Sequence, residues 1–185
     1  RLAAVLARAS DRVATSLDLY GRMLTRSRPR GEVVVIPVFS TVGEPAAVPA
    51  LAGRQRRLLV FGGTGVRGRA YGPAREALAA ACRALSIEEI LDIGPAREVP
   101  SSINGIPVRT LGPLPAAAVG ERMLGALAGF LAYPPDFLPK STIFAAYCAH
   151  GLLPVCAGPH RGENGAFAPP YWEPGSQSPT AGDLQ

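Results

Sequence analysis

The amino-acid sequence predicts an α/β fold in which a parallel sheet carries helices on both faces. From Arg57 onward, short apolar runs alternate with segments of helical spacing. The runs are nearly continuous in apolar residues, which is typical of strands buried between two layers. Several of them end at a glycine, where a sharp turn is expected: Gly62, Gly94 and Gly112. Strands and helices that alternate in this way indicate parallel strands joined by helical crossovers.

The first part of the chain predicts a smaller set of elements. They are the end of a helix at 1–9, a short strand at Asp11–Ser16, a helix at Leu17–Thr25, a basic turn at Ser27–Gly31 and a strand at Glu32–Phe39. The last of these, EVVVIPVF, is expected to be covered on both faces because it is continuously apolar. Thr41–Arg56 is rich in Pro, Gly and Ala and is expected to be a linker.

The second part alternates more regularly. The predicted strands are Leu58–Phe61, Glu89–Ile93, Val108–Leu111, Phe130–Tyr133 and Leu152–Ala157, and the predicted helices are Pro73–Leu85, Ala116–Ala128 and Pro139–His150. Pro73 stands in a first helical turn, where its missing N–H does no harm. Gly151 is expected to close the last helix in a left-handed conformation. We expect Tyr171 and Trp172 to pack the C-terminal segment back on the domain.

Composition limits the classes of function. The chain has 185 residues, 48% of them hydrophobic and 18% charged, which suits a globular protein with its own core. No apolar stretch is long enough to span a membrane and no leader is recognisable, so a cytoplasmic protein is expected. The net charge is +5, but almost every basic residue is Arg and Lys140 is the only Lys. No aromatic and basic stripe accompanies this charge, so nucleic-acid binding is not expected.

The Cys and His residues predict no metal site. Cys82, Cys148 and Cys156 lack the spacing of zinc ligands, and reduced thiols in or near the core are expected. His150 precedes a helix stop and His160 lies in a loop, and neither has a partner at a meaningful spacing. Both histidines are therefore expected to be structural or on the surface.

Candidate binding residues follow from the predicted topology. Ligands of open parallel sheets bind beyond the carboxyl ends of the strands. Here those ends are Gly62–Gly68, Gly94, Gly112–Leu114 and Pro134–Thr142, which would together form one crevice. Small residues there would let a phosphate chain approach backbone N–H groups closely.

The predicted helix start at Pro139 has the chemistry of a diphosphate site. Its first N–H groups are unpaired and favour an anion. The hydroxyls of Ser141 and Thr142 can add donors, and Lys140 can add a positive charge. The alternative is an ordinary capped helix start with a solvated Lys.

The glycine-rich stretch admits a second interpretation. Gly63, Gly65 and Gly68 satisfy the pattern GxGxxG after a strand, which resembles the dinucleotide loop of short-chain dehydrogenases and would make this an NAD(P)-binding protein. Asp92 would then be the ribose acid. Against this, Gly72 and Pro73 are expected to interrupt the following helix. The Tyr-x-x-x-Lys pair is also absent, because Asp136 stands four residues before Lys140.

An ordered set of motifs resembles the GT-B glycosyltransferases. Ala149–Val155 resembles their A-x-G-x-P-V-V block, and Val108–Leu114 resembles their V-x-x-L-G-x-L strand and turn. Asp11–Ser16, followed by Tyr20 and Val34–Pro37, resembles the aD-x-V-x-x-S…V-x-x-I-P passage between the two domains of these enzymes. The order and spacing agree over about residues 10–160.

This resemblance implies two Rossmann-like domains with the donor bound mainly by the second. Residues 1–50 would be a remnant of the N-terminal domain with the linker, 51–172 the Rossmann-like nucleotide-sugar-binding domain, and 173–185 a disordered tail. The implied reaction transfers a sugar from a nucleotide-diphosphate sugar to an acceptor hydroxyl, without a separate cofactor or a metal. The acceptor is unknown, and peripheral membrane contact is expected only if it is a lipid.

The resemblance also implies roles for particular residues. The turn Gly63, Thr64 and Gly65, with Arg67, would face the donor phosphates, and Lys140, Ser141 and Thr142 would cradle the diphosphate. Gly112 and Leu114 would lie near the base. Neutralising the charge of the leaving diphosphate is the main catalytic task of such a site.

The sequence departs from the family at two positions. Many retaining members carry two glutamates with seven residues between them, and the matching positions here hold Leu138 and Ala146. We therefore expect this chain to bind a nucleotide but to turn over poorly alone. A structural or regulatory module, either non-catalytic but nucleotide-binding or without any ligand, stays a third possibility.

Overall fold

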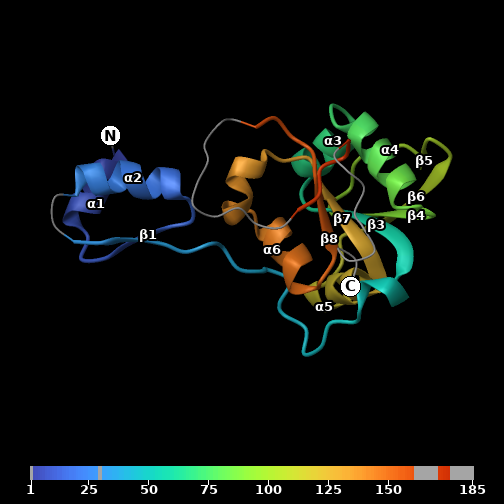
Figure 1. Cartoon of the computed structure of the whole chain (residues 1–185), viewed down its shortest axis with the longest axis horizontal. Helices are drawn as coiled ribbons and strands as arrows, with labels where there is room; N and C mark the ends of the chain where they lie inside the picture. The colour runs from blue at the N-terminus through green and yellow to red at the C-terminus, as the bar shows by residue number, and fades with distance from the viewer. Residues whose placement is uncertain (1, 29–30, 161–170, 176–185) are drawn as a thin grey trace.

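The computed structural model describes residues 2–28, 31–160 and 171–175. Its described part forms a small N-terminal unit and a larger α/β unit joined by an extended segment (Figure 1). The N-terminal unit contains α1 (Leu2–Ala9), β1 (Val13–Thr15), α2 (Asp18–Ser27) and β2 (Val33–Val35). β1 and β2 pair in parallel, and α2 packs against both strands. The predicted helix–strand–helix order is confirmed, whereas the predicted turn at Ser27–Gly31 lies partly outside the described residues.

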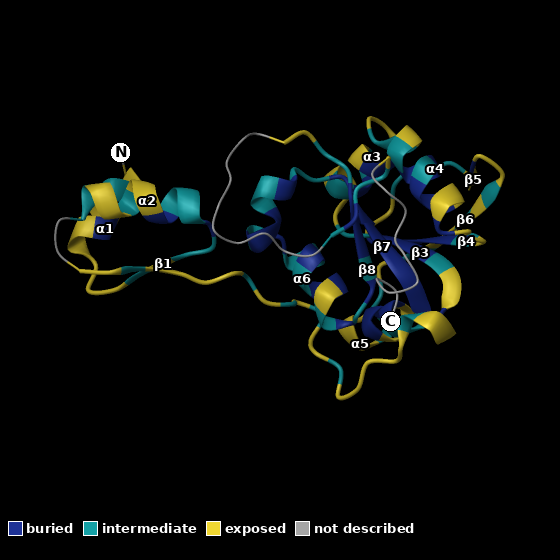
Figure 2. Ribbon diagram, viewed as in Figure 1, coloured by how far each residue is buried: buried dark blue, intermediate teal, exposed yellow. Residues whose placement is uncertain are grey.

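The prediction for Glu32–Phe39 is wrong in length and in burial. The strand is short, and Ile36 and Phe39 beyond it are 57% and 77% exposed. Val34 and Val35 within the strand are exposed as well, so the apolar run is not covered on both faces. Most of the segment from there to β3 is exposed and has no regular structure apart from the 3₁₀ turn Leu51–Gly53 (Figure 2). The linker predicted at Thr41–Arg56 runs two residues too far, because β3 begins at Gln55.

The larger unit is a six-stranded sheet in the order β5-β6-β4-β3-β7-β8. Its strands are β3 (Gln55–Phe61), β4 (Glu89–Ile93), β5 (Ser102–Ile103), β6 (Ile106–Gly112), β7 (Ala126–Leu131) and β8 (Leu153–Cys156). Its helices are α3 (Thr64–Tyr71), α4 (Arg75–Ala84), α5 (Ala116–Gly125) and α6 (Thr142–Ala149), with a 3₁₀ turn η2 at Pro135–Lys140. All pairings are parallel except β5 with β6.

Two hydrophobic cores lie on opposite faces of this sheet. Leu58 and Val60 of β3 join the core beneath α3 and α4, whereas the intervening Leu59 joins the core beneath α5 and α6. All of these side chains are essentially unexposed. Because neighbouring residues of a strand point to opposite faces, a strand between two helical layers must be apolar at every position. The predicted α/β class with helices on both faces is confirmed.

The strand order creates a topological switch point. The five parallel strands lie in the sequence-relative order 3-2-1-4-5, so the chain leaves β3 toward β4 and later returns to the other side of β3 as β7. In sheets of this kind, the loops after the two strands at the switch point diverge to opposite faces and leave a crevice at the carboxyl edge. Here those loops follow β3 and β7.

Several predicted boundaries need correction. Helix α5 ends at Gly125 and the next strand is Ala126–Leu131, earlier than predicted, because a fully buried central strand shows no period that separates it from a helix. Helix α4 begins at Arg75 and not at Pro73, which lies in the preceding turn. The β5–β6 hairpin was not predicted. Its turn has positive φ at both Asn104 and Gly105, and Asn-Gly is the strongest local hairpin signal.

Arg54 connects the amino edge of the sheet to the C-terminal ends of α5 and α6. It immediately precedes β3 and is 8% exposed. Its guanidinium donates to the carbonyl oxygens of His150 at 3.0 Å, Ala126 at 3.2 Å and Pro49 at 2.8 Å. The first two oxygens lie at the C-terminal ends of α6 and α5, where the helix dipole is negative. Burial lowers the pKa of Arg54, yet a guanidinium stays charged at neutral pH.

The predicted packing of the C-terminal segment is confirmed for Trp172. It is 8% exposed, and its backbone N–H donates to the carbonyl of Pro154 in β8 at 2.9 Å. Only residues 173–175 of the predicted disordered tail at 173–185 lie within the described part of the chain.

Candidate functional site at the carboxyl edge of the sheet

Glycines end three neighbouring strands at the same edge. The N–H of Gly62, after β3, donates to Ile93 O at 3.1 Å, and the N–H of Gly94, after β4, donates to Gly112 O at 3.0 Å. All three glycines have positive φ, at 129°, 151° and 69°. An ideal Cβ on Gly94 would collide with the carbonyl oxygen of Gly62. The fold itself therefore requires glycine at Gly94, and the strand ends predicted from the sequence do meet at one edge.

Helix α3 begins directly after this edge and corrects the predicted loop at Gly62–Gly68. Only Gly62 and Gly63 are non-helical, and the helix runs from Thr64 through Gly65 and Gly68. Gly63, Thr64 and Gly65 are exposed, and no side chain caps the first N–H groups of the helix. The expected interruption at Gly72 and Pro73 is confirmed, because α3 ends at Tyr71 and α4 begins only at Arg75.

Neither Gly63 nor Gly65 is required by the fold. A Cβ on either would meet no atom within 4 Å, and neither has positive φ. Glycine within a helix costs about 1 kcal/mol relative to alanine. These two glycines therefore leave open space beside unpaired backbone donors without any gain in packing.

Helix α6 begins on the other side of the switch point. The predicted start at Pro139 is wrong, because Pro135–Lys140 is a 3₁₀ turn and Ser141 is the N-cap of a helix that starts at Thr142. Ser141 is 8% exposed, and its hydroxyl accepts from the N–H of Phe144 at 3.2 Å. This oxygen therefore caps the helix. The N–H groups of Thr142 and Ile143 precede the first helical acceptor and stay unpaired within the helix.

The two helix starts are in contact. An ideal Cβ on Gly62 would lie 2.5 Å from Cδ1 of Ile143 in the first turn of α6. The turn after β3 and the first turn of α6 therefore lie side by side, and α3 and α6 begin there on opposite faces of the sheet. Both helix N-termini carry partial positive charge. This arrangement favours an anion with two charged groups.

Lys140 lies immediately before the second helix start. Its ammonium is 3.5 Å from the hydroxyl of Tyr20, and 4.8 Å and 5.7 Å from the ring centres of Phe137 and Tyr20. Among the described residues it forms no ion pair with a carboxylate. The positive charge of Lys140 is therefore not neutralised by the described part of the chain.

Arg67 does not face the crevice, which corrects its predicted role. Its side chain is fully buried, with two nitrogens donating to the Asp92 carboxylate at 2.9 Å and 2.5 Å and a third to Pro95 O at 2.5 Å. Arg67 stands on the inner side of α3, above β4, where a charge requires a partner. Asp92 is equally buried, so in this conformation it is not available as a ribose acid.

Arg97 is a cation that the sequence patterns did not single out. It follows β4 and is partly exposed, and its guanidinium donates to the carbonyl of Thr64 in the first turn of α3. No motif marks an Arg in the loop after a second strand. Only the topology brings it beside the start of α3.

Tyr147 occupies the sheet at the switch point. It is fully buried, and its hydroxyl accepts from the N–H of Phe61 at 3.2 Å and lies 3.3 Å from the carbonyl oxygens of Leu59 and Phe130. Burial raises the pKa of Tyr147, which keeps it protonated at neutral pH. The ring packs on Gly129, where any side chain would collide with it. Tyr147 thus joins the carboxyl ends of β3 and β7, because its hydroxyl lies within hydrogen-bond distance of backbone atoms in both strands.

The remaining predicted residues have mixed placements. Gly112 ends β6, and Leu114 is partly buried against the α5/α6 core, so this turn belongs to the same edge. Leu138 and Ala146 are both completely buried, so neither reaches a ligand. His150 is buried, with Nδ1 2.9 Å from Ala146 O, and is structural as expected. His160 is exposed in a loop beside Glu173, so it is a surface residue as expected.

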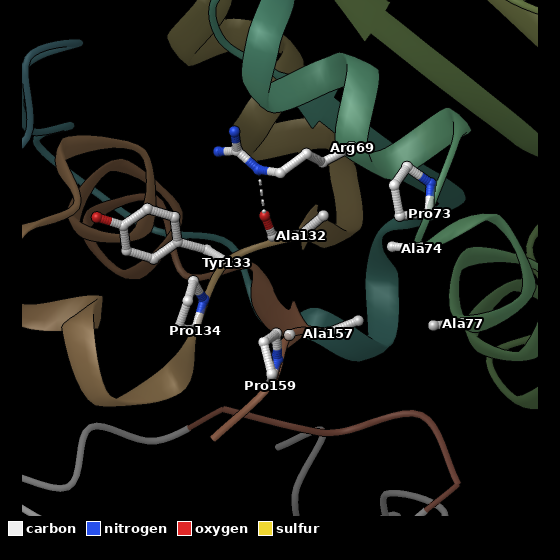
Figure 3. Close-up of a pocket in the computed structure, with 10 residues that line it drawn as sticks. Arg69, Pro73, Ala74, Ala77, Ala132, Tyr133, Pro134, Ala157 and Pro159 are labelled. Atoms are coloured by element: carbon white, nitrogen blue, oxygen red, sulfur yellow. Dashed lines mark hydrogen bonds between the residues drawn. The ribbon is translucent and has the colours of Figure 1, made fainter. Parts of the chain in front are cut away.

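A separate pocket of about 600 Å³ includes Pro134 of the predicted strand end Pro134–Thr142 but none of the residues predicted to bind phosphate. Figure 3 shows its lining: Arg69, Pro73, Ala74 and Ala77 from α3, the following turn and α4, and Ala132, Tyr133, Pro134, Ala157 and Pro159 after β7 and β8. Arg69 donates to the carbonyl of Ala132 at 3.2 Å and is the only charged residue among the described lining. The walls are mainly apolar, which does not suit a diphosphate.

Residues 2–28, 31–160 and 171–175 contain no cluster of His, Cys, Asp or Glu that could hold a metal ion. Within the same ranges, no helix has the length and apolar character needed to cross a bilayer. Cys82 and Cys156 are buried and Cys148 is exposed, and burial raises the pKa of Cys82 to about 12. A thiol with so high a pKa is a poor nucleophile.

No family model matches this sequence, and no curated protein matches it either. Among solved structures, one similar chain is AviGT4, a glycosyltransferase involved in avilamycin A biosynthesis. It has a TM-score of 0.46 and 18% identity, with 73% of this chain and 42% of the other covered. Another is an α-glucosyltransferase in complex with UDP, with a TM-score of 0.49, 11% identity and 83% and 48% coverage.

A third similar structure is an α-glucosyltransferase in complex with UDP and a 13-mer DNA containing an HMU base. It has a TM-score of 0.41 and 12% identity, and covers 81% of this chain and 46% of its own. In each case the alignment spans less than half of the other chain. The identities are low, so what these proteins bind and catalyse is not transferred to this chain.

Proposed function

We propose that this chain binds the diphosphate of a nucleotide-sugar donor at the switch point, as the donor-binding half of a glycosyltransferase. The diphosphate would lie between the first turns of α3 and α6. There it would accept hydrogen bonds from the uncapped N–H groups after Gly63 and from those of Thr142 and Ile143. Lys140 would add a positive charge from the α6 side.

The observation that carries this proposal is the pair of glycines at the start of α3. Gly63 and Gly65 are exposed, have ordinary backbone conformations and have room for a side chain. Glycine at such positions keeps backbone donors accessible to a phosphate chain, as the second glycine of dinucleotide loops does. Gly94, by contrast, is explained by packing alone.

The reaction class comes from the sequence resemblance to GT-B glycosyltransferases. In sugar transfer from such donors the leaving group is a nucleoside diphosphate, and charge develops on it as the glycosidic bond breaks. Two helix N-termini and an unneutralised Lys would stabilise that charge in a fixed geometry. Leu138 and Ala146 are buried where the family carries glutamates, so contacts to the donor sugar must come from other residues.

Lys140→Ala tests the diphosphate site. We expect one of UDP, GDP or ADP to bind the wild-type chain saturably, and the variant to bind it about tenfold more weakly, because one charge-assisted hydrogen bond is lost. Calorimetric or thermal-shift titration gives the affinities, with the corresponding sugar nucleotides and NAD(P)H in the same panel. Arg83→Ala removes one exposed positive charge from α4 and serves as the matched control.

Three results would contradict the proposal. They are no saturable binding of any nucleoside diphosphate, equal affinity in Lys140→Ala and the wild type, and binding of NAD(P)H alone. The last would support the dehydrogenase-like interpretation, although the buried Asp92 would then have to leave Arg67 to reach a ribose.

Gly65→Ala separates fold from function at the start of α3. We expect the variant to be about 0.5–1 kcal/mol more stable, because alanine is the better helix residue and meets no neighbour. We also expect weaker diphosphate binding, because the new methyl group covers the backbone donors. Urea denaturation and the same titration measure the two effects. Gly53→Ala, which also adds a methyl in open space but far from this edge, should not change affinity.

A further inference from the structure

The two units of the chain meet at Lys140. Tyr20 lies on α2 of the N-terminal unit, 120 residues before Lys140, and its hydroxyl is 3.5 Å from the ammonium. Beside this contact, the N–H of Val38 in the connecting segment donates to Pro139 O at 2.9 Å. The residue expected to carry the charge of the site is thus held from outside the α/β unit.

The surroundings of the ammonium are aromatic. The rings of Phe137 and Tyr20 have their centres 4.8 Å and 5.7 Å from Nζ, within the range of cation–π attraction. A carboxylate in this place would order the side chain but cancel its charge. Aromatic rings order it and leave the full charge, and an ammonium has three donors, of which the Tyr20 hydroxyl takes only one.

We propose that Tyr20 is a positioning residue for Lys140, so that diphosphate affinity depends on the packing of the N-terminal unit against the α/β unit. This inference rests on the diphosphate site proposed above. Tyr20 does not touch the ligand. It restricts the long, flexible side chain of Lys140 before the ligand binds. Binding then costs less conformational entropy of that side chain.

Tyr20→Ala and Tyr20→Phe test this role in the full chain. We expect Tyr20→Ala to weaken binding of the tightest of UDP, GDP and ADP roughly threefold to fivefold, and Tyr20→Phe to have a smaller effect because the ring remains. Affinity for the corresponding nucleoside, which lacks phosphates, should not change. In the Lys140→Ala background, Tyr20→Ala should have no further effect, as a double-mutant cycle would reveal.

A general structural effect is separable from positioning. Met23→Ala changes an exposed residue of the same helix and should leave all affinities unchanged. An equal loss for nucleoside and diphosphate, or an equal loss with and without Lys140, would overturn the positioning role. Tighter binding by Tyr20→Ala would also overturn it, because Tyr20 would then hold Lys140 away from the ligand.

The outcomes distinguish this inference from the proposed function. If Lys140→Ala weakens diphosphate binding and Tyr20→Ala does not, the site stands and the role of Tyr20 is wrong. If Lys140→Ala has no effect, the diphosphate site itself is wrong and the role of Tyr20 falls with it.

Discussion

Arg67→Met is expected to destabilise the chain by about 3–5 kcal/mol, because it leaves the Asp92 carboxylate buried without a partner. Both side chains of this ion pair have 0% exposure. Arg67 also donates to Pro95 O, so the variant removes one of the contacts between α3 and the loop after β4. The measurement is urea denaturation followed by far-UV circular dichroism, with the slope of the transition checked for change.

A partly exposed ion pair between β3 and β4 provides the matched control. Arg57 and Glu89 lie 2.6 Å apart at the start of β3 and β4, with side chains 30% and 22% exposed. Arg57→Met should cost less than about 1 kcal/mol, because solvent compensates an exposed charge. The double variant Arg67→Met with Asp92→Leu should recover much of the loss. A cost for Arg67→Met no greater than that for Arg57→Met would contradict the burial argument.

Arg54→Met is expected to cost about 2–4 kcal/mol, because it removes several charge-assisted hydrogen bonds and leaves buried carbonyl oxygens unpaired. The buried oxygens belong to His150 and Ala126, and Arg54 also donates to the partly buried carbonyl of Pro49. The loss would loosen the C-terminal ends of α5 and α6 together. Since the start of α6 forms one side of the proposed site, we also expect weaker diphosphate binding.

Hydrogen exchange followed by mass spectrometry measures this local effect. Protection should fall in α5 and α6 and be retained in β4, which Arg54 does not contact among the described residues. Arg56→Met, two residues further along the chain and exposed, is the control and should change neither protection nor stability appreciably. Equal losses from Arg54→Met and Arg56→Met would mean that the carbonyl cluster contributes little.

The strand edges could be predicted because their causes are local. Glycine after an apolar run marks a sharp turn, and Gly62, Gly94 and Gly112 do end their strands with positive φ. The start of α6 was predicted three residues too early. Pro139 is acceptable in a first helical turn, but the chain uses it in a 3₁₀ turn and begins the helix after the Ser141 cap.

The functional roles of individual charges could not be predicted from their spacing. Arg67 and Arg69 are two residues apart on α3, yet Arg67 is fully buried beside Asp92 and Arg69 is exposed beside the pocket of Figure 3. Which face of α3 turns toward the sheet depends on how the helix packs. For the same reason Arg97, which no motif marks, lies beside Thr64.

The sequence by itself determined the fold class and the strand ends, because apolar continuity and glycine placement are properties of short segments. Only the tertiary structure decided which charges are available. Arg67 is paired with Asp92, and Arg54 donates to carbonyl oxygens at helix ends. Lys140 lies near two aromatic rings and forms no ion pair with a carboxylate among the described residues. The physical reason is that the state of a charge depends on its burial and its neighbours, and those neighbours are 25, 96 and 120 residues away along the chain.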